Sequence, residues 1–235
     1  MNIFRCCRAW CTTLLLLTCS PSLLAATPDD QLIVGMNMNN LLTLDPAAMT
    51  GNEVVGIVVN LYDGLVELDP RQLTEVRPAL AQRWEISADN RQLTFHLRDG
   101  VHFHSGNALS SADVVWSMRR VLHLNLAQAS VWKSYGFTKD NVDQQITAPD
   151  ARTVVIQLPK PNDPQLVLYS LAALGSMVVL DSKTVQSHAI NTDWGNRWLT
   201  THEAGSGPLR LDVWQAKDVR RSSRDAQYSR GAPKL

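Results

Sequence analysis

The chain has 235 residues, 45% hydrophobic and 19% charged, and its 22 basic residues balance 22 acidic ones. This composition is typical of a folded soluble protein of one or two domains. The balanced charge argues against a nucleic-acid partner and against an anionic membrane as partner.

The first 26 residues have the pattern of a secretory signal peptide. The first ten carry two arginines and no acid, an apolar run follows at Leu14–Leu17, and small residues stand at Ala25 and Ala26. Pro21 interrupts the apolar run, which is shorter than the roughly 18 to 20 residues of a membrane span. We therefore expect export and removal of residues 1–26, with a lipid anchor at Cys19 as the open alternative.

All four cysteines lie in this leader, at positions 6, 7, 11 and 19. The mature part is therefore expected to have no disulfide and no cysteine nucleophile or metal ligand. A secreted domain of this length can bury enough surface without disulfides. Its net charge without the leader is about −2.

The first third of the mature chain predicts short mixed elements. Gln31–Asn37 has the pattern of a buried strand, and residues 53–61 place their valines on one helical face. Gly64 ends that helix, and residues 65–69 predict a short strand. Pro78–Trp84 predicts a helix of one or two turns that begins at the proline.

Two alternating segments follow, and they predict a β-hairpin. Leu93–Leu97 and Val101–His104 each alternate apolar and polar residues. A three-residue turn ending at Gly100 would pair Leu97 with Val101 and Phe95 with Phe103, which keeps one face dry.

Further along, a helix is predicted from Ser110, with Asp113 in capping-box position and a buried stripe on one face. Residues 151–158 predict a strand, residues 166–175 a buried helix, and residues 176–180 another strand. A Gly-rich turn at 204–208, followed by a strand, completes the pattern. The helical stripe consists of Val114, Val115, Met118, Val121 and Leu122.

The hairpin would bring three histidines to one face, where His96 lies opposite His102 and His104 follows two residues on. Imidazole is a common metal ligand, so a secreted metal-dependent enzyme that uses His96, His102 and His104 is one hypothesis. The alternative is an ordinary solvent-facing strand surface, because no acidic residue or cysteine is arranged with them. No phosphate loop, dinucleotide fingerprint or zinc-protease motif occurs, and we expect no cofactor and no bound metal.

The stretch "LAQRWEISADNRQLTFHLRDGVHFHSGNALSSADVVWSM" resembles the segment that marks the periplasmic solute-binding proteins of peptide and nickel ABC importers, the extracellular solute-binding proteins of family 5. The likeness extends to "TLDPA", "LYDGLVELD", "GSGPLRLDVW" and "GAPKL", and so covers essentially the whole mature chain. The residues that match the family pattern in the marking segment are Leu80, Ala81, Trp84, Phe95, Leu97, Arg98, Gly100, Val101, Phe103, His104, Gly106, Ala112, Asp113 and Val114.

This resemblance implies an α/β fold, namely the N-terminal part of a two-lobed periplasmic-binding-protein-like (type II) fold with mixed sheets and flanking helices. Residues 27–60 and 159–235 would form an incomplete first lobe, and residues 61–158 an inserted subdomain. The second lobe is expected to be missing. The polar segment Arg220–Ser223 also departs from the apolar strand of the family, so a truncated product, a fragment or an inert decaying product is expected.

The resemblance further implies a function without catalysis, in which a periplasmic monomer captures a peptide or a similar solute for an ABC permease of the inner membrane. Nickel, heme and oligosaccharide remain open as cargo. The residues expected to contact the ligand are Met49, Thr50, Gly51 and Asn52, in the loop after "LDPA", and Tyr135. A glycine in such a loop lets main-chain groups approach a ligand, although Gly51 also fits an ordinary turn. With one lobe absent, we expect weak binding or none by this chain alone.

Overall fold

The computed structural model describes residues 31–35, 37, 39, 41–50, 52–173, 177–215 and 218–234. The predicted signal peptide lies outside these residues. Two units are distinguished, Met1–Gly35 with Leu235 and Met36–Lys234, and the helices and strands of the described residues belong to the second. None of the helices in the described part has the length and apolar character needed to cross a bilayer.

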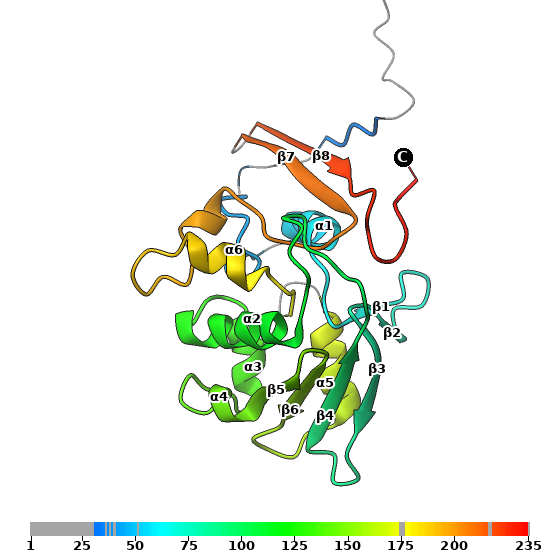
Figure 1. Cartoon of the computed structure of the whole chain (residues 1–235), viewed down its shortest axis with the longest axis vertical. Coiled ribbons are helices and arrows are strands. Elements are labelled where there is room, and N and C mark those ends of the chain that lie inside the picture. The colour runs from blue at the N-terminus through cyan, green and yellow to red at the C-terminus, as the bar shows by residue number, and fades with distance from the viewer. Residues whose placement is uncertain are drawn as a thin grey trace, which may run out of the picture. The chain divides into compact units, whose positions relative to one another are not determined.

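Helices and strands alternate irregularly along this second unit (Figure 1). The helices are α1 (Asn52–Leu61), α2 (Ser111–Leu124), α3 (Ala129–Ser134), α4 (Val142–Gln145), α5 (Pro164–Ala172) and α6 (Ser182–Ser187), with a 3-10 turn η1 at Trp198–Thr200. The strands are β1 (Val66–Leu68), β2 (Val76–Pro78), β3 (Ala81–Ile86), β4 (Gln92–Leu97), β5 (Ile146–Asp150), β6 (Thr153–Gln157), β7 (Leu209–Gln215) and β8 (Val219–Arg224).

The largest sheet is antiparallel, with strand order β3-β4-β6-β5. Its central strand β4 buries Leu93, Phe95 and Leu97 and leaves the alternating residues half-buried. Val154 and Ile156 of β6 are buried in the same hydrophobic cluster. The predicted strands at 93–97 and 151–158 are therefore confirmed, because alternation with period two identifies a sheet that is covered on one face.

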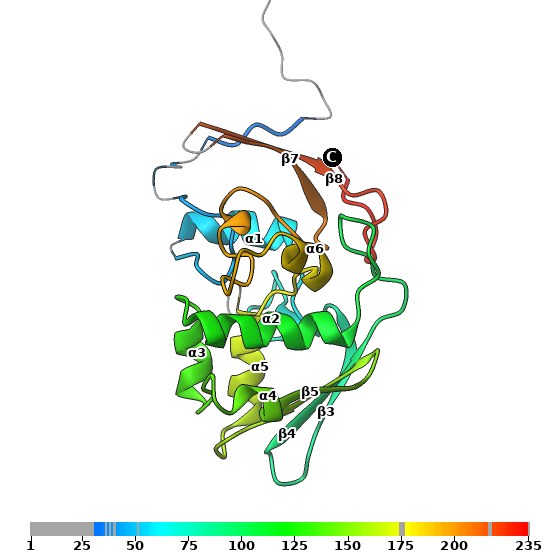
Figure 2. The same ribbon diagram turned by 60° about the vertical axis from the view of Figure 1, so that its left-hand side comes forward.

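Helix α2 lies along the covered side of this sheet, together with α5 (Figure 2). Its predicted start is confirmed: the backbone N–H of Ser110 donates to the Asp113 carboxylate at 2.9 Å, as in a capping box. The other carboxylate oxygen of Asp113 accepts from the hydroxyl of Ser182 at 2.6 Å, which ties α2 to the start of α6. All five residues of the predicted stripe are buried.

The buried apolar residues form two clusters. One is built on the four-stranded sheet and includes Val167, Leu168 and Leu171 of α5. The other surrounds α1 and joins Leu44 to residues of the 178–204 segment. The predicted division at residues 61 and 158 stays a prediction, and α5 packs in the sheet cluster although it was assigned to the first lobe.

The segment 204–208 passes against the end of α1 and leads into the β7–β8 hairpin. A Cβ atom on Gly205 would overlap the carbonyl oxygen of Leu61, and a Cβ atom on Gly207 would lie 2.6 Å from the carbonyl oxygen of Asn60. The N–H of Gly207 donates to the Leu61 carbonyl at 3.1 Å. These glycines are therefore required by close backbone approach as well as by the turn.

Three local predictions are wrong. Residues 31–35 form no strand, and the side chains of Leu32 and Ile33 are 74% exposed. Pro78–Trp84 contains no helix: Pro78 ends β2, which pairs with β1, and Ala81–Trp84 open β3, which pairs with β4. Residues 177–180 form no strand, and only Val178 makes a bridge, to Gly64. A strand forms where a neighbouring strand pairs with the segment and does not form where that pairing is lacking, whatever the local propensity.

The predicted hairpin of Leu93–Leu97 with Val101–His104 is also wrong. Both edges of β4 are occupied, by β3 and by β6, so the next segment cannot pair with it. Val101 and Phe103 are buried nevertheless, and His102 bridges to Ala108. By contrast, the polar segment Arg220–Ser223 forms a strand in β8, because the two-stranded β7–β8 sheet leaves much of its surface to solvent.

Candidate functional site

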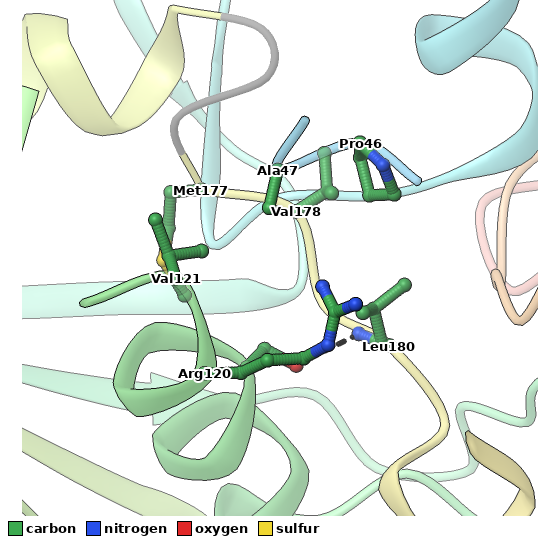
Figure 3. Close-up of a pocket in the computed structure, with 8 residues that line it drawn as sticks. Pro46, Ala47, Arg120, Val121, Met177, Val178 and Leu180 are labelled. Atoms are coloured by element: carbon green, nitrogen blue, oxygen red, sulfur yellow. Dashed lines mark hydrogen bonds between the residues drawn. The ribbon is translucent and has the colours of Figure 1, made fainter. Parts of the chain in front are cut away.

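A fully buried ion pair holds the loop of residues 45–50, which precedes α1 in the chain. The guanidinium of Arg120 on α2 binds both carboxylate oxygens of Asp45, at 2.9 Å and 2.5 Å, and both side chains are 0% exposed. Figure 3 shows Arg120 reaching from α2 toward the segment that carries Val178 and Leu180. Buried charges of this kind are tolerated only when they are paired and hydrogen-bonded.

Further hydrogen bonds satisfy this pair. The Nε of Arg120 donates to the Trp194 carbonyl at 2.7 Å, and Nδ2 of Asn196 donates to Asp45 at 2.6 Å. The N–H of Ala47 donates to the Asp45 carboxylate at 3.1 Å, which closes a turn. Helix α2, the 194–196 segment and the loop are thereby fixed to one another.

A second anchor holds the far end of the loop. Nε2 of Gln128 donates to the Met49 carbonyl at 2.9 Å, and the N–H of Gln128 donates to the Ala47 carbonyl at 3.1 Å. The hydroxyl of Tyr62 donates to the Leu44 carbonyl at 3.0 Å from the α1 side. Hydrogen bonds therefore anchor the loop as far as Met49.

The structure separates the five residues predicted to contact a ligand. Met49 is buried in the cluster around α1, and Thr50 is exposed. Gly51 lies outside the described residues, and of Asn52 only the backbone, which starts α1, is described. Tyr135 is buried in the sheet cluster, and its hydroxyl is bonded to Ser170 and Leu166 of α5. The ligand-binding role of these residues stays a prediction.

A small cavity lies behind the loop, between α2 and the 177–180 segment (Figure 3). Its volume of about 10 Å³ is comparable with the space that one water molecule needs. A peptide or a similar solute cannot enter it. Its lining residues are Pro46, Ala47, Ser117, Arg120, Val121, Met177, Val178 and Leu180.

The three histidines do not converge. His96 bonds to Glu85 at 3.2 Å, and His102 bonds to the Gly100 carbonyl at 3.0 Å. His104 bonds to Glu203 and Gly207, in a different part of the chain. Within the described ranges, no group of three or more His, Cys, Asp or Glu side chains is placed to hold a metal. The predicted facing of His96 and His102 is wrong, and the metal-dependent enzyme has no support.

The ring of His104 instead makes two hydrogen bonds to the 203–207 segment, and this arrangement is called the His104 clasp below. Its Nδ1 lies 2.7 Å from a Glu203 carboxylate oxygen, and its Nε2 lies 2.9 Å from the Gly207 carbonyl oxygen. Both partners are acceptors, so the ring fills both bonds only as the doubly protonated imidazolium. Burial lowers the pKa of His104, but the hydrogen bond and charge of Glu203 outweigh burial, and the net pKa is raised above 6.5.

Sequence analysis did not identify Arg120, Asn196 or Gln128 as parts of this site. Arg120 stands outside the apolar stripe of α2, where an arginine ordinarily faces water. The Asp45-Pro46 turn was the one usable signal, because an aspartate before a turn commonly bonds the backbone two residues on. Nothing local predicts partners 75 or 151 residues away.

Solved structures share this fold. MoaA of A. tumefaciens R10, solved with mannopinic acid, aligns with a TM-score of 0.69 at 24% identity over 85% of this chain and 38% of its own. DppA of Helicobacter pylori, solved with the peptide STSA, aligns with a TM-score of 0.65 at 26% identity over 82% of this chain and 38% of its own. The fold is therefore part of the two-lobed fold of periplasmic binding proteins, as predicted.

Residues 75–235 match the model of the middle part of bacterial extracellular solute-binding proteins, family 5. The chain belongs to this family, and the predicted resemblance is confirmed. A probable D,D-dipeptide-binding periplasmic protein of Escherichia coli K12, DdpA, is 31% identical over 86% of this chain and 37% of its own length. YgiS of the same organism, a probable deoxycholate-binding periplasmic protein, is 32% identical over 79% and 35%. The chain thus spans a little over a third of these relatives.

Proposed function

We propose that these residues supply one wall of the solute cleft of a periplasmic binding protein, which captures peptides for an ABC permease of the inner membrane. The observation that carries the proposal is membership of family 5, together with 31% identity to a probable D,D-dipeptide-binding protein. The structures of a peptide complex and of a mannopinic acid complex have the same fold, so the fold alone does not select the cargo.

The proposed contact surface is the loop from Met49 to Asn52. Thr50 is exposed, and the loop before it is fixed by buried polar bonds. A preformed wall of this kind lowers the entropy cost of ligand binding. Met49 and Tyr135 are both buried, so among the described residues of the predicted set this proposal gives the direct ligand contact to Thr50.

The proposed protein performs no reaction. It is exported as a monomer, and its two lobes close on the solute by hinge motion. A single wall cannot exclude water from the ligand, so we expect these residues alone to bind only weakly.

A nuclear magnetic resonance titration of the isotopically labelled chain tests the cargo. We expect a mixture of di- and tripeptides to shift amide signals at residues 48–50, and deoxycholate to leave them unchanged. Shifts caused by deoxycholate and not by peptides would contradict the peptide proposal. Calorimetry on the same samples should detect no micromolar binding, and tight binding there would show that one wall suffices.

A further inference from the structure

We propose that Gln128 is a positioning residue that orients the peptide plane between Met49 and Thr50 and so presents the Thr50 N–H to a carbonyl or carboxylate oxygen of the solute. This inference rests on the proposed function, in which the loop from Met49 to Asn52 is the contact surface. Nothing in the local sequence marks Gln128 for this role, because it stands at the start of α3, 79 residues after Met49.

The geometry begins with the Met49 carbonyl. It accepts a hydrogen bond from the side-chain amide of Gln128 at 2.9 Å, which fixes its direction. A trans peptide group is planar, and its C=O and N–H point in opposite directions. The N–H of Thr50 therefore points away from Gln128.

That N–H is available. Among the described residues it has no hydrogen-bond partner, and Thr50 itself is exposed. A main-chain donor with no internal partner needs water or a ligand. The oxygens of a peptide backbone have the complementary chemistry.

The residues that precede this peptide plane are anchored by several hydrogen bonds. The backbone N–H of Gln128 also donates a hydrogen bond to the Ala47 carbonyl, at 3.1 Å. Asp45, locked by the buried Arg120, binds the N–H of Ala47. Of these contacts, the side-chain bond of Gln128 is the one that reaches Met49, so its loss should free the last peptide plane and leave the rest of the turn intact.

The test compares three variants by ¹⁵N relaxation of the Thr50 amide. Gln128→Met keeps the length of the side chain and removes the donor, and Gln128→Lys keeps a donor. Gln144→Met, on the exposed surface of α4, is the matched control. We expect the Thr50 order parameter to fall from about 0.85 to below about 0.6 in Gln128→Met. It should remain high in Gln128→Lys and in the control.

An unchanged order parameter in Gln128→Met would overturn the proposal. So would an equal fall in Gln128→Met and Gln128→Lys, since the side chain would then act by shape and not as a donor. A titration with di- and tripeptides tests the proposed function separately from the positioning role of Gln128. We expect Gln128→Met to bind these peptides roughly twofold to tenfold more weakly than the control. If the order parameters behave as expected but peptides shift no signal in any variant, the positioning role stands and the proposed function fails.

Discussion

Arg120 and Asp45, 75 residues apart in the chain, form a bidentate ion pair with no exposed surface on either side chain. The pair joins α2, which covers the sheet, to the loop that precedes α1. The two hydrophobic clusters meet at this loop, because Ala47 belongs to the sheet cluster and Leu44 and Met49 belong to the cluster around α1. The pair therefore connects the packing of the sheet to the shape of the candidate contact surface.

Breaking this pair should destabilise the fold strongly. Arg120→Met leaves the Asp45 carboxylate buried without its counter-charge, and we expect a loss of about 3 to 5 kcal/mol of unfolding free energy. Urea denaturation followed by circular dichroism measures it.

The matched control is Arg152→Met, which removes a pair with Asp99 in which both side chains are mostly exposed. It should change the stability little. If Arg120→Met lowered the unfolding free energy as little as Arg152→Met does, the buried pair would not hold the loop.

The clasp of His104 with Glu203 should make stability depend on pH. Because the folded pKa of His104 is raised above 6.5, the charged ring stabilises the fold fully below about pH 6.5. This contribution is lost as the pH rises through the folded pKa. The difference in unfolding free energy between the wild type and His104→Gln should therefore shrink from pH 6 to pH 9.

Two further charged groups act at His104: the charge of Asp225 also raises its pKa, and Arg210 donates to its main-chain carbonyl. Both are present in the variant, so the difference isolates the ring. His102→Gln, whose ring reaches only the Gly100 carbonyl, is the control and should leave the pH dependence unchanged. Parallel pH profiles for wild type and His104→Gln would show that the clasp carries no charge.

Alanine at Gly205 should be poorly tolerated. The added methyl group would overlap the Leu61 carbonyl, so the backbone must shift, and we expect a loss of about 3 kcal/mol, the upper end of the usual cost of overpacking. Gly56→Ala is the opposite case, because nothing lies near its Cβ position and it is inside α1. It should stabilise the protein by about 0.5 to 1 kcal/mol. Thermal melts of the two variants that shift in the same direction would contradict this packing of the 204–208 segment.

Local patterns predicted local structure well. The capping box of Ser110 with Asp113 and the apolar stripe behind it identified α2, because all of the interacting groups lie within a few turns of one helix. The alternation of Leu93, Phe95 and Leu97 identified β4, because a strand covered on one face shows its period of two within its own sequence.

Pairings over long distances could not be predicted in this way. The neighbours of β4 are β3 and β6, and β6 begins more than 50 residues later, so the nearer hairpin partner was chosen wrongly. The burial of Arg120 depends on Asp45 and Trp194, which no periodicity connects to it. The loop of the candidate site was expected from family resemblance, whereas the side chains that hold it became visible only in three dimensions.

The most direct measurement of the central claim, that these residues form a cleft wall at the loop of residues 45–52, uses a dipeptide that carries a nitroxide label. The label broadens the signals of nearby amides, and the reduced, diamagnetic peptide provides the reference. We predict broadening at Ala48, Met49 and Thr50, with saturation only near about millimolar peptide, and none at β4. Broadening centred on His96 and His102, or none at the loop at saturating peptide, would contradict the claim.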